Sequence, residues 1–80
     1  MQIIEKPTLQ QIRQQKKTLD GKTITRQMIA EKAGLTYGDV YVLDIGGHLA
    51  QAKGRKVLWA FNELSGCELT IHDIKRGGYS

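Results

Sequence analysis

Few side chains in this sequence have the types and spacing that catalysis or metal binding requires. Cys67 and His72 form a C-x4-H pair, and His48 lies far from both along the chain. A structural zinc site normally takes closely spaced pairs of cysteine or histidine ligands, which this arrangement lacks. The sequence also has neither a glycine-rich phosphate loop nor a paired-carboxylate motif. We therefore expect no metal, no cofactor and no enzyme activity.

Cationic side chains are the groups in this sequence best suited to binding. The 80 residues include 12 Lys and Arg against 8 Asp and Glu, so the formal net charge is +4. This excess favours a polyanionic partner such as nucleic acid. Lys53, Arg55 and Lys56 fall at the start of an expected helix, where their charges oppose the helix dipole. A bound anion or a nearby phosphate would offset that opposition.

Length and composition limit how the chain can be organised. Eighty residues make one domain, which we assign to 1–80, and its core is small enough that a homodimer is expected. The single cysteine, Cys67, excludes an intrachain disulfide, as in a reducing compartment. No apolar run is long enough to span a bilayer, and the opening MQIIEKPT lacks a secretory signal pattern. These features predict a cytoplasmic protein with no membrane partner.

The elements that must position these side chains begin with a helix after Thr8. Thr8 can cap this helix, because Gln11 stands in the capping-box position three residues later. Leu9 lies on the face expected to meet the core. The helix should end near Lys17, before the turn sequence TLDGK. Residues 1–7 are expected to form an extended lead-in.

Two short helices are expected to follow, joined by a tight turn. Thr25 can cap the segment RQMIAEKA, and Gly34 can end it by accepting a left-handed backbone conformation. Thr36 can then cap a third segment, with Asp39 at its third helical position. A glycine-containing turn between two short helices is typical of a helix-turn-helix unit.

The third segment, YGDVYVLDI, is consistent with either a strand or a helix. Its β-branched and aromatic residues have a high strand propensity. The threonine cap and the helical spacing of Val40 and Leu43 favour a helix. We therefore predict a helix over about 37–45, ended by the Gly46-Gly47 pair.

The fourth expected helix, from about Gln51 to Leu64, has the clearest pattern in the chain. Its apolar stripe at helical spacing consists of Val57, Leu58, Phe61 and Leu64. After it we expect one helical turn capped by Thr70, with Leu69, Ile71 and Ile74 covering the core. Residues 75–80 are expected to be a flexible tail. The predicted fold is therefore all-α, a compact bundle of four to five helices.

The stretch ITRQMIAEKAGLTYGDVYVLDIGG, followed by KGRKVLWAFNEL, resembles the phage-repressor and Cro family, the lambda-repressor-like or XRE type of helix-turn-helix proteins. The resemblance covers most of residues 8–64. The matching features are the AEKAG helix end, Leu35 and Thr36 in the turn, Val40 and Leu43 in the next helix, and the Asp44-x-Gly46 ending. The resemblance implies a transcriptional regulator of the repressor kind that binds double-stranded DNA.

In that family the second helix of the motif lies in the major groove, and the first crosses the phosphate backbone. Carried over by position, the residues facing base edges would be Tyr37, Gly38, Tyr41 and Val42. Phosphate contacts would come from Thr25, Arg26, Lys53, Arg55 and Lys56. Arg26 has a second possible role, which is to brace the recognition helix. The base-facing set lacks the paired donors and acceptors that read bases, so selectivity is expected to be low or to depend on DNA shape.

A protein-interaction module of the same fold, such as an antitoxin or an adaptor, is the alternative. The docking face would then consist of Tyr37, Tyr41, Val42, Ile45 and Trp59. The absence of polar base readers favours this alternative, whereas the basic start of the fourth helix and the intact turn pattern favour DNA. Helical spacing also turns Trp59 partly outward, where a dimer or a partner would cover it.

Overall fold

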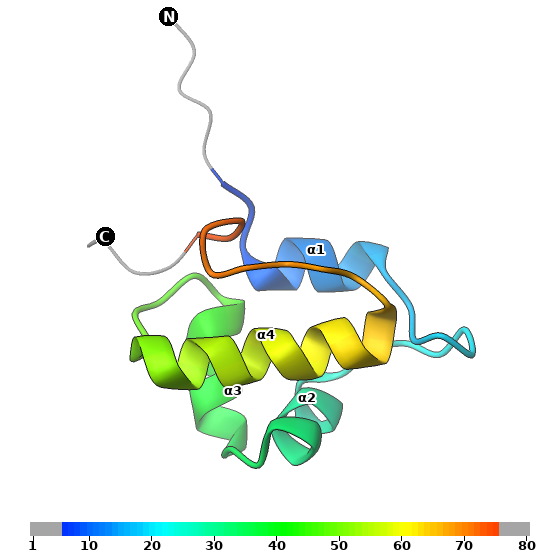
Figure 1. Cartoon of the computed structure of the whole chain (residues 1–80), viewed down its shortest axis with the longest axis horizontal. Coiled ribbons are helices and arrows are strands. Elements are labelled where there is room, and N and C mark those ends of the chain that lie inside the picture. The colour runs from blue at the N-terminus through cyan, green and yellow to red at the C-terminus, as the bar shows by residue number, and fades with distance from the viewer. Residues whose placement is uncertain (1–5, 76–80) are drawn as a thin grey trace, which may run out of the picture.

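The computed structural model describes residues 6–75, and within that range the chain forms four helices and no strand. The helices are α1 (Leu9–Gln15), α2 (Arg26–Ala33), α3 (Tyr37–Asp44) and α4 (Gln51–Ser65). In Figure 1, α4 crosses in front of α3, with α1 above it and α2 below it. The all-helical class is confirmed. No helix in this range has the length and apolar character needed to cross a membrane.

Local capping explains where the first three helices begin. Each follows a threonine whose hydroxyl accepts a hydrogen bond from the backbone amide three residues later. The three threonines are Thr8, Thr25 and Thr36. At Thr8 the bond is reciprocated, because the Gln11 side chain accepts from the Thr8 amide at 2.9 Å. The predicted starts of these helices are therefore confirmed, whereas α1 ends at Gln15, slightly before the predicted Lys17.

The ambiguous third segment is a helix, as predicted. Val40 and Leu43 are fully buried on its inner side. Gly46 follows the helix with a φ of +87°, and the amide of Gly47 donates to the carbonyl oxygen of Val42 at 2.8 Å. A Cβ on Gly47 would lie only 2.9 Å from that same oxygen, so this close approach requires glycine. The glycine pair therefore ends α3.

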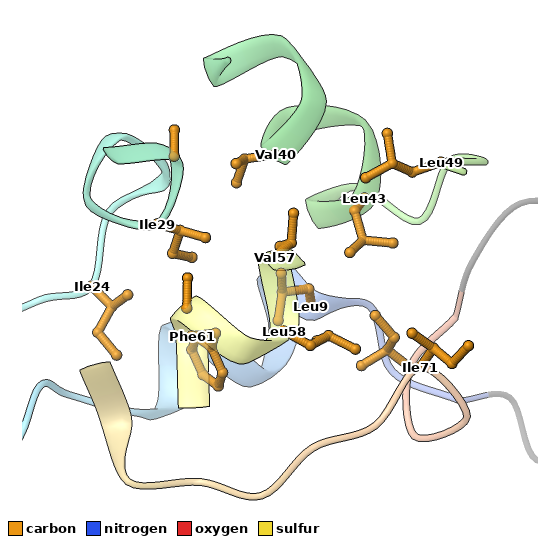
Figure 2. Close-up of a cluster of buried hydrophobic side chains, with 13 residues drawn as sticks. Leu9, Ile24, Ile29, Val40, Leu43, Leu49, Val57, Leu58, Phe61 and Ile71 are labelled. Carbon is orange, nitrogen blue, oxygen red and sulfur yellow. The ribbon is translucent and has the colours of Figure 1, made fainter. Parts of the chain in front are cut away.

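The core lies between α4 and the other three helices. Figure 2 shows Val57, Leu58 and Phe61 of α4 in one cluster with buried side chains from the other elements. These partners include Leu9 of α1, Ile29 of α2, and Val40 and Leu43 of α3, all fully buried. The amphipathic α4 thus packs on α2 and α3, and α1 packs on α3.

After α4 the chain returns along that helix toward the start of α1 (Figure 1). The side chain of Asn62 holds this segment through two hydrogen bonds of 2.9 Å, one to the carbonyl and one from the amide of Leu69. Ile71 and Ile74 are buried on the core, as predicted, while Leu69 is only partly buried. Residues 71–74 form turns instead of the predicted helical turn, so the described chain has four helices. The lead-in up to residue 5 and the tail from residue 76 lie outside the described residues.

Candidate nucleic-acid interface

The exposed side of α3 is dominated by two tyrosines. Tyr37 and Tyr41 are 48% and 42% exposed, and their rings are stacked with centroids 6.5 Å apart and planes 16° apart. Gly38 is exposed beside them, and Ile45 is exposed just past the helix end. Val42 is half-buried and packs against the core, so it contributes less to this face than the sequence suggested. We call Tyr37, Gly38, Tyr41 and Ile45 the α3 face.

A short turn fixes α3 relative to α2. Gly34 takes the left-handed conformation with a φ of +72°, and the Leu35 amide then donates to the Ala30 carbonyl at 3.0 Å. The partly buried Leu35 side chain packs against the core. Thr36 caps α3 only two residues after Gly34, so the two helices are joined with little freedom.

A buried carboxylate ties α3 to both preceding helices. Asp44 is 0% exposed and accepts two hydrogen bonds from Arg13 in α1, at 3.0 and 2.9 Å. It also accepts one from the Nε of Arg26 in α2, at 2.7 Å. Arg13 donates a further bond to the carbonyl of Ile24 at 2.9 Å. We call Arg13, Arg26 and Asp44 the arginine–aspartate clamp.

Sequence reasoning missed Arg13 and the buried position of Asp44, although helical spacing contains the signal. Arg13 lies four residues after the buried Leu9, and Asp44 lies four residues after the buried Val40. Residues four apart share one face of a helix, so both charges lie on core-facing sides. A charge in that position requires a partner of opposite sign, because an unpaired buried charge is very costly.

Arg26 connects the clamp to the α3 face. Its Nη1 donates to the Tyr37 hydroxyl at 3.2 Å, and its guanidinium carbon lies 4.8 Å from the centre of the Tyr41 ring. The hydrogen bonds to Tyr37 and to Asp44 raise the pKa of Arg26 above its ordinary value. Two guanidinium groups surround one carboxylate, so the clamp carries a net positive charge beside both tyrosines. Through these contacts Arg26 braces α3. Its Nη2 has no hydrogen-bond partner among residues 6–75.

Two of the predicted phosphate-binding residues, Thr25 and Lys53, already contact other residues of the protein. The Thr25 hydroxyl accepts from the Met28 amide at 3.1 Å as the cap of α2. Lys53 of α4 forms an ion pair with Asp39 of α3 at 3.4 Å. Desolvation acts to raise the pKa of Asp39, but hydrogen bonds with Thr36 and the charge of Lys53 outweigh it, so this pKa lies below its ordinary value. Lys53 is thereby held next to the start of α3.

The remaining basic residues of α4 do not share that position. Arg55 lines a shallow hollow of about 420 Å³ between α4 and the returning segment, together with Trp59 and His72. Lys56 is exposed. Trp59 is 52% exposed, and the ammonium of Lys32 lies 5.6 Å from its ring centre. The predicted phosphate-binding set is therefore divided, because within residues 6–75 Lys53 is the only cation of α4 that forms an ion pair with α3.

The metal-ligand candidates were Cys67, His72 and His48. Cys67 is half-buried and forms no disulfide within residues 6–75, and both histidines are exposed. Within residues 6–75 no three His, Cys, Asp or Glu side chains gather closely enough to hold a metal ion. In the turn that carries His72, the Thr70 hydroxyl instead donates a hydrogen bond to the Asp73 carboxylate at 3.1 Å.

Comparisons with known proteins leave the family of this chain undetermined, because the chain matches no family model, no curated protein and no solved structure. The geometry of the α3 face and the charges around it are therefore the features that indicate a function.

Proposed function

We propose that this protein is a cytoplasmic, lambda-repressor-like helix-turn-helix domain. It would bind duplex DNA with α3 in the major groove and regulate transcription. The observation that carries the proposal is the α3 face itself. It is an exposed helix surface, placed by a tight turn after α2 and fixed by a clamp of net positive charge. Helices that read DNA are positioned in this way.

Electrostatics supports a polyanionic partner at this surface. Asp44 is neutralised by two arginines, and the free Nη2 of Arg26 remains beside the exposed tyrosines. Lys53 adds an ammonium donor next to the start of α3, although Asp39 offsets its charge. A phosphate near these groups would gain charge-assisted hydrogen bonds without a rearrangement of the clamp.

Gly38 supports close approach of a partner to α3. A Cβ at this position would meet only the Thr36 hydroxyl oxygen, at an ordinary 3.8 Å, so the packing of the described residues does not require glycine. Glycine within a helix costs roughly 0.5–1 kcal/mol relative to alanine. The absence of a side chain at Gly38 would let a duplex lie close to the backbone of α3, which would offset this cost.

The composition of the α3 face favours weak base discrimination. Tyr37 can donate to a phosphate or a base, and the Tyr41 ring can contact a thymine methyl group, but neither makes the paired hydrogen bonds that identify a base. We therefore expect selectivity to arise mainly from groove shape, through the clamp and the lysines.

Salt-dependent binding to a mixed-sequence duplex tests the proposal. If about three phosphates are contacted, the logarithm of the association constant falls against the logarithm of salt concentration with a slope of about −2.7. Lys53→Ala should reduce the steepness by about one unit. Lys22→Ala removes the same charge from the loop before α2 and serves as the control, with an unchanged slope. An affinity that stays constant as salt rises would exclude this mode of binding.

A protein-interaction module is the second candidate, favoured by the apolar and aromatic character of the α3 face. Tyr41→Ala distinguishes the two, since a tyrosine at the centre of a protein interface commonly contributes much of the affinity. If Tyr41→Ala abolishes binding to a protein partner while duplex affinity is unchanged, the interaction module replaces the DNA-binding proposal.

A further inference from the structure

The outward side of α4 has a charge pattern that is complementary to itself. Arg55 and Glu63 lie four residues before and four residues after the half-exposed Trp59. Residues at this spacing share one helix face, so a cation, an indole and a carboxylate follow one another along α4. Neither Arg55 nor Glu63 forms an ion pair within residues 6–75, and both are exposed.

We propose that a second copy of this chain docks on this surface, with the two α4 helices antiparallel and crossing at Trp59. A twofold axis at Trp59 brings Arg55 of each copy opposite Glu63 of the other. Both residues lie about 6 Å along the axis from the crossing point, within reach of their long side chains at the common helix-crossing angles. A parallel pairing would instead oppose like charges, so the pattern selects the antiparallel arrangement.

Helix electrostatics indicates that these charges do not serve the isolated monomer. α4 has no acidic residue in its first turn and no basic residue in its last turn. Arg55 and Lys56 lie in its N-terminal half, and Glu63 lies near its C-terminus. A helix by itself is stabilised by the opposite distribution. In the antiparallel pair, each end of α4 lies beside the oppositely charged end of its neighbour, which reverses that disadvantage.

The hollow beside Trp59 gives the second copy an apolar contact. Leu58 and Leu69 line this hollow, and Trp59 forms part of its edge. When the two tryptophans meet at the axis, each indole lies at the mouth of the hollow of the other copy. An exposed tryptophan entering a pocket on its partner is typical of the residues that dominate interface energetics. The surface is isologous, as a twofold dimer requires.

The first test measures mass against concentration by sedimentation equilibrium in low salt, in the absence of DNA. We expect a monomer–dimer equilibrium between micromolar and millimolar concentration. Trp59→Ala should raise the dissociation constant about 30-fold or more. Trp59 is the only tryptophan, so its fluorescence should shift to shorter wavelength as the dimer forms. Tyr41→Ala removes an aromatic ring from the α3 face instead and is the matched control, with an unchanged dissociation constant.

The second test addresses the antiparallel register. Arg55→Glu and Glu63→Arg should each weaken self-association, because each places like charges opposite one another. Both changes suit the dipole of α4, so the folded monomer should be retained, and thermal unfolding checks this. An equimolar mixture of the two single variants should dimerise as well as the wild type, since the mixed pair restores both opposite-charge contacts.

Three results would overturn the proposal: a monomer at millimolar concentration, an unchanged dissociation constant for Trp59→Ala, or a mixture of single variants that stays monomeric. The α3 face takes no part in this pairing. Failure here would therefore leave the duplex-binding proposal intact, and failure of duplex binding would leave the dimer intact.

Discussion

The outer surfaces of α3 and α4 both expose aromatic rings, but they are supported in different ways. On α3, Tyr37 and Tyr41 are stacked on each other and held by Arg26, which is anchored to the buried Asp44. On α4, Trp59 contacts one exposed lysine and lies between opposite charges that have no partner within residues 6–75.

This difference separates a surface organised before binding from one that is completed by binding. The α3 face has its hydrogen bonds and its charge fixed within the monomer, as a positioned recognition surface requires. The α4 surface leaves complementary charges unpaired at both ends, which a second copy would satisfy. Substitutions in the clamp and on the α3 face should therefore change stability and duplex binding, most strongly at the buried carboxylate.

The largest effect is expected from Asp44→Asn, which removes the charge at the centre of the clamp. Arg13 and Arg26 would then face each other without a counterion in a mostly buried site. Loss of one partner from a buried ion pair costs about 3–5 kcal/mol, against a total stability of roughly 4–12 kcal/mol for a domain of this size. Urea unfolding followed by circular dichroism measures the change.

Asp20→Asn is the control for that experiment. The Asp20–Lys22 pair lies in the loop before α2, and its side chains are largely exposed. Exposed ion pairs contribute about 0–1 kcal/mol, so the loss of stability should be small. Equal destabilisation by the two substitutions would contradict the special role of the clamp.

A smaller effect is expected from Arg26→Lys, which keeps the charge but removes the planar guanidinium. Lysine cannot donate to Asp44 and Tyr37 together while stacking on Tyr41, so stability should fall by about 1–2 kcal/mol. Duplex affinity should fall while the salt slope is preserved, because the number of cations is unchanged. A variant that matches the wild type in stability and in affinity would show that the bracing of α3 is unnecessary.

The smallest effect is expected from Gly38→Ala. Nothing in the described packing opposes a Cβ there, so the substitution should stabilise the fold, by at most about 0.5–1 kcal/mol because Gly38 lies in the first turn, while weakening duplex binding. Gly54→Ala is the matched control, because a Cβ at the buried Gly54 would meet only Ile71, at 3.9 Å. The control should leave duplex affinity unchanged. Stronger duplex binding by Gly38→Ala would mean that the partner does not approach α3 closely at this position.

Much of the fold could be predicted from local signals. The threonine caps and the glycine stops act within a few residues, so Thr8, Thr25 and Gly34 indicate helix ends without knowledge of the rest of the chain. In the segment 37–45 the β-branched residues suit a strand, and the Thr36 cap and the spacing of Val40 and Leu43 already favoured a helix. Burial of Val40 and Leu43 against α4 favours the helix, which is a tertiary effect.

The candidate site was predictable only in part, and Arg26 shows why. Its two possible roles, phosphate contact and brace, depend on what lies near its guanidinium. The bracing partners are Asp44, 18 residues away, and Tyr37, 11 residues away. Similarly, the cations Lys53, Arg55 and Lys56 lie within one helical turn, yet the helix turns Lys53 toward α3 and Arg55 toward the hollow.

The sequence by itself determined the helical class, the caps, the turn between α2 and α3, and the apolar stripe of α4, because each depends on backbone preferences and spacing within one segment. The tertiary structure alone decided that Arg13, Arg26 and Asp44 meet, and that the α3 face is braced while Trp59 is not. Those outcomes depend on how the helices pack, since packing determines which distant charges share a buried site.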